Sequence, residues 1–63
     1  MKMGIFSLTI ELGNDAMQTL GDVRRALIDV ATTLTDRQTS TQPDRGRIGD
    51  ENGNTVGTWR YVP

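Results

Sequence analysis

The chain has 63 residues, a formal net charge of -1, 35% hydrophobic residues and 24% charged residues. Its mass of 7.0 kDa allows one domain and no second one. It contains no cysteine and no histidine, which excludes disulfide bonds, thiol and imidazole catalysis, and nearly every zinc, copper or iron site.

The N-terminal segment predicts a strand over residues 5–12. Every second residue there is apolar, a period that places those side chains on one face of a strand. The apolar set, expected to face a core, is Phe6, Leu8, Ile10 and Leu12. The alternate set, expected to face solvent, is Ile5, Ser7, Thr9 and Glu11. No apolar run is long enough for a membrane helix or a secretory leader, so a cytoplasmic protein is expected.

A helix is predicted over residues 20–36. Thr19 and Asp22 have the spacing of a capping box, with Asp in place of the preferred Glu. Apolar residues then follow at steps of three and four, which is typical of a helix with one buried face: Leu20, Val23, Leu27, Val30 and Leu34. This helix and the strand over residues 5–12 have similar lengths, each about 25 Å, so the helix can cover the strand.

The part of the chain after the helix predicts a surface linker over residues 37–45 and a hairpin over residues 46–62. The linker has no hydrophobic residue, and the hairpin contains Asn52-Gly53, a strong turn signal between β-rich flanks. Two registers are open. A loop of two or four residues places Ile48 on one face with Gly57, Trp59 and Tyr61, whereas a three-residue loop with a bulge at Gly53 groups it with Val56, Thr58 and Arg60.

The position of Trp59 depends on that register. We favour the first register because Trp59 is the largest hydrophobic residue of a chain with few others, and it is then the core anchor. In the second register, Trp59, Tyr61 and Ile5 form an exposed aromatic patch.

These elements predict an α+β fold, a single βαββ domain over residues 1–63. Strand order 1-3-2 gives a three-stranded antiparallel sheet with one helix packed on one face. Order 1-2-3 is the alternative, but the second strand is short and flanked by glycine, which suits an edge. The expected core is Phe6, Leu8, Ile10, Leu12, Val23, Leu27, Val30, Leu34, Ile48 and Trp59.

The acidic residues do not predict a metal or catalytic site. Residues 50–54 (DENGN) have part of a calcium-loop pattern, but Tyr61 stands where the bidentate Glu is required. Asp22 and Asp29 are seven residues apart on one helix, where a solvated face is expected. We therefore predict a protein that is not an enzyme and that needs no metal and no cofactor.

The predicted sheet leaves one face uncovered, and the candidate partner-binding residues are those expected on that face: Ile5, Arg45, Arg47, Val56 and Arg60. Arginines on a sheet are able to contact nucleic-acid phosphates and bases. The isoelectric point of about 5.0 argues against that use. A protein partner is therefore favoured, and a nucleic-acid-binding regulator using Arg45, Arg47 and Arg60 is the alternative.

Residues 8–19 (LTIELGNDAMQT) and 53–59 (GNTVGTW) resemble small uncharacterised proteins of actinobacteria and their phages or plasmids. The resemblance implies a phage or mobile-element context and no particular activity, ligand or functional residue. A homodimer is also expected, because the core is small and the strand over residues 5–12 has no Lys or Pro to block pairing at its edge.

Overall fold

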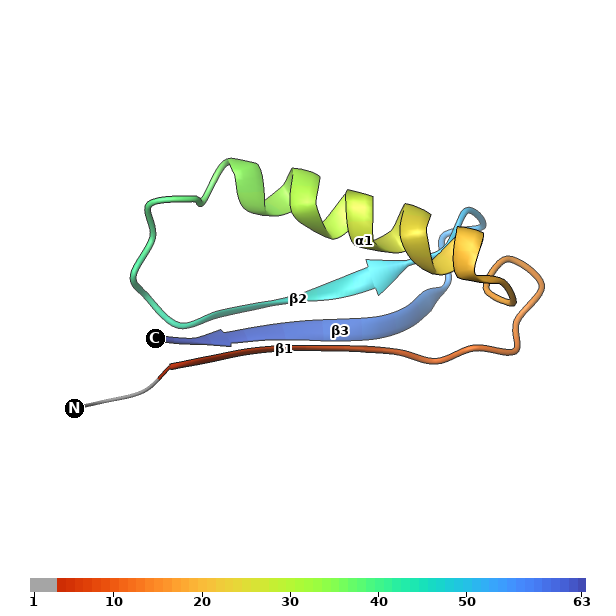
Figure 1. Ribbon diagram of the computed structural model, residues 1–63, viewed down its shortest axis with the longest axis horizontal. Coiled ribbons are helices and arrows are strands. Elements are labelled where there is room, and N and C mark those ends of the chain that lie inside the picture. The colour runs from red at the N-terminus through yellow and green to blue at the C-terminus, as the bar shows by residue number, and fades with distance from the viewer. Residues whose placement is uncertain (1–3) are drawn as a thin grey trace.

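The computed structural model describes residues 4–63. It contains four elements in chain order, β1 (Ile5–Ile10), α1 (Leu20–Thr35), β2 (Asp44–Gly49) and β3 (Thr55–Val62). The strands form one antiparallel sheet in the order β1-β3-β2, and α1 lies along one of its faces (Figure 1). The predicted α+β class, strand order and one-helix layer are confirmed.

The element boundaries differ from the prediction by a few residues. β1 ends at Ile10 because Gly13, with a φ of 119°, turns the chain away soon afterwards. β2 begins at Asp44, inside the predicted linker, because Asp44 pairs with Tyr61 in the sheet and forms an ion pair with Arg37. The connection between α1 and β2 is therefore shorter than expected.

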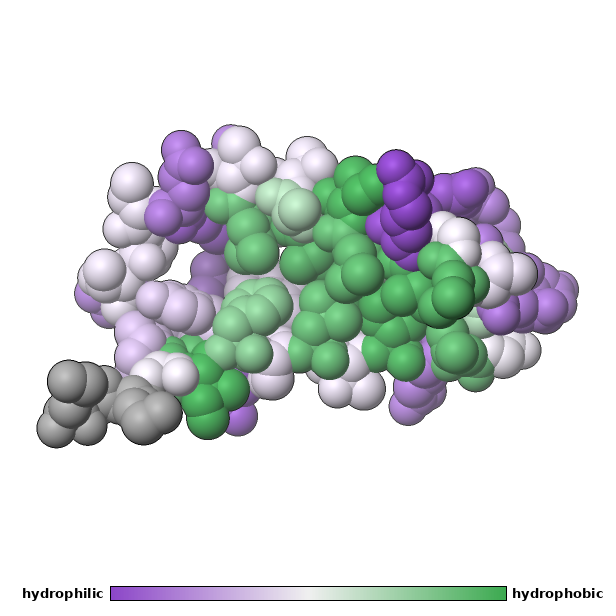
Figure 2. Space-filling model, in the orientation of Figure 1, coloured by the Kyte–Doolittle hydropathy of each residue, from purple (hydrophilic) through white to green (hydrophobic). Residues whose placement is uncertain are grey.

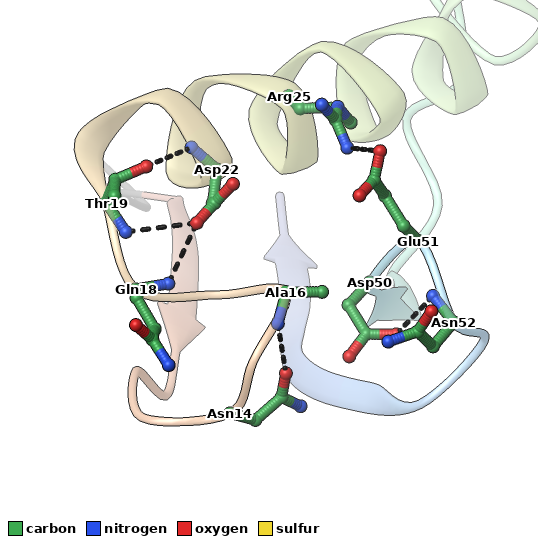
Figure 3. Close-up of polar contacts among 9 residues, drawn as sticks. All are labelled: Asn14, Ala16, Gln18, Thr19, Asp22, Arg25, Asp50, Glu51 and Asn52. Carbon is green, nitrogen blue, oxygen red and sulfur yellow. Dashed lines mark hydrogen bonds and ion pairs between the residues drawn. The ribbon is translucent and has the colours of Figure 1, made fainter.

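Helix α1 begins with the predicted capping box. The Thr19 hydroxyl oxygen accepts a hydrogen bond from the Asp22 backbone N–H at 3.1 Å. In return the Asp22 carboxylate accepts from the backbone N–H groups of Thr19, at 3.1 Å, and Gln18, at 2.9 Å (Figure 3). Three donors at the helix start are thus satisfied by local side chains.

The hairpin has the register that places Trp59 against the helix. Gly46 pairs with Trp59 and Ile48 pairs with Gly57, so Ile48 and Trp59 share the face that α1 covers. Both side chains are buried. The core position of Trp59 and the face it shares with Ile48 are confirmed. The predicted loop of two or four residues is wrong, because Asp50 and Asn54 close a three-residue loop and a β-bulge restores the shared face.

A β-bulge in β3 changes the position of Val56. The pairing with β2 passes from Ile48–Gly57 to Gly49–Thr55, which leaves Val56 as the extra residue. Such an extra residue shifts the alternation of side chains by one, so Val56 joins the core. Its predicted place on the uncovered sheet face is wrong, since the side chain is 5% exposed.

The buried core is smaller than predicted and partly different. It consists of Met17, Ala26, Val30, Ile48, Val56 and Trp59, with Leu8, Ile10, Val23, Leu34 and Tyr61 packed partly against it. Met17 reaches it because the loop before α1 folds back on itself: the Met17 N–H donates to the Asn14 carbonyl, and the Met17 carbonyl accepts from Gly13, both at 2.9 Å.

Three residues predicted in the core are exposed, namely Phe6, Leu12 and Leu27. The reason is the lateral position of the helix. Among the strands, α1 packs most extensively on β2, which lies at the opposite edge of the sheet from β1. Figure 1 shows the helix above β2, with β1 on the far side of β3. The apolar side of β1 is therefore left partly uncovered.

Candidate functional site

An exposed apolar surface lies between α1 and β1. Its most exposed members are Phe6 at 47%, Leu12 at 62%, Leu20 at 87% and Leu27 at 44%. We call this surface the apolar strip, and it consists of these four residues with the partly buried Leu8, Ile10 and Val23. Figure 2 shows apolar residues continuing from the helix across to the neighbouring strand, with a polar side chain near one end.

Helix geometry explains why Leu20 and Leu27 belong to this strip. Residues seven apart lie on the same side of an α-helix, whereas residues two apart lie nearly opposite. Arg25 forms an ion pair with Glu51, in the turn that joins β2 to β3 (Figure 3). Its side of α1 therefore faces that turn, and Leu27 lies on the other side, toward β1.

One end of the strip is an aromatic pocket of about 230 Å³. The ring of Phe6 stacks on that of Trp59, with centroids 6.0 Å apart and planes 24° apart. The guanidinium carbon of Arg37 lies 5.9 Å from the Trp59 ring centroid, and its Nη1 donates to Asp44 at 2.8 Å. Leu34 and Tyr61 complete the apolar lining. Such a pocket suits an apolar or aromatic side chain.

The free edge of β1 runs beside the strip. The Glu11 N–H donates to the Val56 carbonyl at 2.7 Å, so the backbone groups of Glu11 point toward β3. Backbone direction alternates along an antiparallel strand, so those of Phe6, Leu8 and Ile10 point away from β3. Since β1 lies at one edge of the sheet, these backbone groups are placed so that another strand is able to pair with them.

The opposite sheet face, which α1 does not cover, carries four of the five predicted partner-binding residues. Arg45 pairs with Arg60 across β2 and β3, and neither forms an ion pair with any residue from 4 to 63. Ile5 pairs with Val62 on β1 and β3. Arg47 instead bonds within its own hairpin, donating to the Thr55 hydroxyl at 2.8 Å and the Gly53 carbonyl at 3.1 Å.

The acidic residues near the hairpin form a turn. The Asp50 carboxylate accepts from the backbone N–H groups of Asn52 and Asn54, each at 2.9 Å. Desolvation raises the pKa of Asp50, but hydrogen bonds from Asn14, Asn54 and Asn52 outweigh it, so the pKa of Asp50 lies below its ordinary value. In the described part of the chain, no three acidic side chains are grouped as metal ligands.

Sequence reasoning missed the apolar strip. A signal for it is the predicted core itself, which assigns four apolar residues of the segment 5–12 and four of the predicted helix to a single helix–strand contact. Leu20, the first residue of α1, has the spacing of the predicted apolar face of the helix, yet it is 87% exposed.

No helix within residues 4–63 has the length and apolar character needed to cross a membrane. Comparison with known proteins finds no family model, no curated protein and no solved structure that matches this chain.

Proposed function

We propose that this chain is a small non-enzymatic interaction protein that binds a protein partner through the apolar strip and the free edge of β1. The observation that carries the proposal is an apolar surface that continues from α1 to the neighbouring strand (Figure 2), together with the exposure of Phe6, Leu12, Leu20 and Leu27. Single exposed apolar residues are ordinary, whereas a contiguous exposed patch is characteristic of a contact surface. We place the protein in the phage or mobile-element setting that its sequence resemblance implies.

Two further features support a polypeptide as the partner. The backbone groups of Phe6, Leu8 and Ile10, which point away from β3, suit addition of a strand, which supplies affinity through main-chain hydrogen bonds. The aromatic pocket at the end of the strip suits an apolar anchor side chain, the kind of residue that dominates the energy of many interfaces. A strand with one apolar side chain entering that pocket satisfies both features.

Photocross-linking in cells that produce the full chain tests this proposal. A photoreactive amino acid replaces Leu27 in one variant and Ile28 in the other. These neighbours are 44% and 46% exposed, but only Leu27 belongs to the apolar strip. We expect a covalent adduct with a polypeptide at position 27 and at least tenfold less at position 28. Equal yields at the two positions, or no adduct at position 27, would contradict the proposal.

A second candidate function, binding of nucleic acid, is favoured by the arginines of the open sheet face. Arg45 and Arg60 stand opposite each other as like charges, an arrangement that is unfavourable unless an anion lies between them. Anisotropy of a labelled duplex at low and moderate salt tests this. Binding that weakens with salt and is lost in the Arg45→Ser, Arg60→Ser double variant, but kept in Arg24→Ser, supports this function. Absence of salt-dependent binding removes it.

A further inference from the structure

We infer that the partner at the apolar strip is a second copy of this chain, joined by antiparallel pairing of β1 with β1 of the copy, with Leu8 opposite Leu8. This inference rests on the proposed function, because it names the occupant of the same surface. It describes a symmetric dimer with a continuous six-stranded sheet and both helices on one side of it.

The backbone of β1 selects the register. The three residues whose N–H and C=O groups point to the free edge are Phe6, Leu8 and Ile10. A two-fold axis at Leu8 pairs Leu8 with Leu8 of the second copy and Phe6 with its Ile10. If the second copy is shifted by two residues along β1 in either direction, one of these three residues no longer lies opposite Phe6, Leu8 or Ile10 of that copy. The register with Leu8 opposite itself therefore satisfies the whole edge of β1 in both copies.

The side chains of β1 fit the same register. On the helix side, Phe6, Leu8 and Ile10 of the two copies are all apolar, so the two strips adjoin as one continuous apolar surface between the two helices. On the other side, Ser7 lies opposite Thr9 of the copy, a favourable cross-strand pair. The one charged residue within residues 5–11 is Glu11. It lies opposite Ile5 of the second copy, so pairing brings no like charges together.

The other sheet edge fits a second copy less well. Within β2, three of the six residues are charged, namely Asp44, Arg45 and Arg47, and two are glycine. Charged side chains and glycines on an edge strand disfavour pairing with a neighbouring sheet. The uncharged segment Ile5–Ile10 has no such protection.

Sedimentation equilibrium of the purified full chain over micromolar to millimolar concentration tests the dimer. We expect a mass of twice 7.0 kDa at the upper concentrations. Leu27→Glu should raise the dissociation constant at least tenfold, because it places a charge beside the joined apolar strips in each copy. Ile28→Glu, at a position of similar exposure outside the strip, should change the dissociation constant less than twofold. A single-chain mass throughout, or equal effects of the two variants, overturns the inference.

Disulfide trapping tests the register and does not depend on whether Leu27→Glu folds. The chain has no cysteine, so introduced thiols have no competitors. In the inferred register Ser7 and Thr9 of the copy form a non-hydrogen-bonded pair, with Cα atoms about 4.5 Å apart, which a disulfide is able to span. An oxidised mixture of Ser7→Cys and Thr9→Cys chains should cross-link at least fivefold more than either alone. Preferential linking of Arg45→Cys chains to each other would instead place the contact at β2 and overturn the inference.

The two proposals fail in different ways. A photoadduct at position 27 with the mass of two chains supports both of them. An adduct of that residue with a different protein, together with a monomeric purified chain, keeps the proposed function and overturns the dimer. No adduct and a monomeric chain overturn both.

Discussion

The indole ring of Trp59 lies directly over Gly46 of the neighbouring strand. The two residues are partners in the β2–β3 ladder, and a Cβ atom on Gly46 would overlap Nε1 and two ring carbons of the indole. The glycine therefore provides the space that holds the largest side chain of the core. A glycine inside a strand often marks such a close approach.

We expect Gly46→Ala to lower the free energy of unfolding by about 1–3 kcal/mol, because the methyl group overlaps a buried ring that has little room to move. Urea unfolding followed by the fluorescence of Trp59, the single tryptophan, measures the change. Gly49→Ala is the matched control on the same strand, where a Cβ would make ordinary contacts of 3.7 Å. Equal losses in the two variants would show that the indole is not held against Gly46.

Gly21→Ala is expected to stabilise the protein by up to about 1 kcal/mol. Gly21 lies in the first turn of α1, it is exposed, and a Cβ there meets only the Thr19 hydroxyl at 3.5 Å. Alanine loses less backbone entropy on folding than glycine does. Thermal unfolding measures the gain. The contrasting variant is Gly53→Ala, which should destabilise because its φ of 85° is unfavourable for alanine.

Met17→Ala is expected to cost about 2–5 kcal/mol of stability, as truncation of a fully buried side chain does. Leu12→Ala, at a position 62% exposed, should change the stability of the monomer by less than about 0.5 kcal/mol. Unfolding is measured at concentrations low enough that self-association does not contribute. The opposite ranking would mean that the loop before α1 does not hold Met17 in the core.

Stability should fall as the pH is lowered from about 5 toward 2. Hydrogen bonds from the backbone N–H groups of Gln18 and Thr19 hold the pKa of Asp22 below its ordinary value of 3.8. A carboxyl whose pKa is lower in the folded state contributes stability above its unfolded pKa, and that contribution is lost as the pH falls through its folded pKa. Asp50, whose pKa is also lowered, acts in the same direction.

The variant Asp22→Asn separates the two carboxyls. It should weaken the dependence of the melting temperature on pH in this acid range without abolishing it, because Asp50 continues to titrate. Asp29→Asn, on the same helix but outside the capping box, is the control. An unchanged pH dependence in Asp22→Asn would contradict the role assigned to this cap.

The local elements of this protein are determined by its sequence. The spacing of Thr19 and Asp22 predicts the start of α1, because a capping box involves only groups within one turn. Asn52-Gly53 predicts the hairpin, because the backbone of a tight turn favours glycine there. The short, glycine-flanked segment that became β2 indicated an edge strand, and this was enough for the strand order.

The tertiary structure alone decided which apolar residues are buried and which form the candidate site. Period-two and period-3.6 patterns show which residues share a face, but not how far across the sheet the helix lies. An α-helix about 10 Å wide covers roughly two strands spaced about 4.8 Å apart, so in a three-stranded sheet one strand stays partly uncovered. Here the uncovered strand is β1, so Phe6 and, just after the strand, Leu12 lie at the surface, while the bulge in β3 brings Val56 into the core.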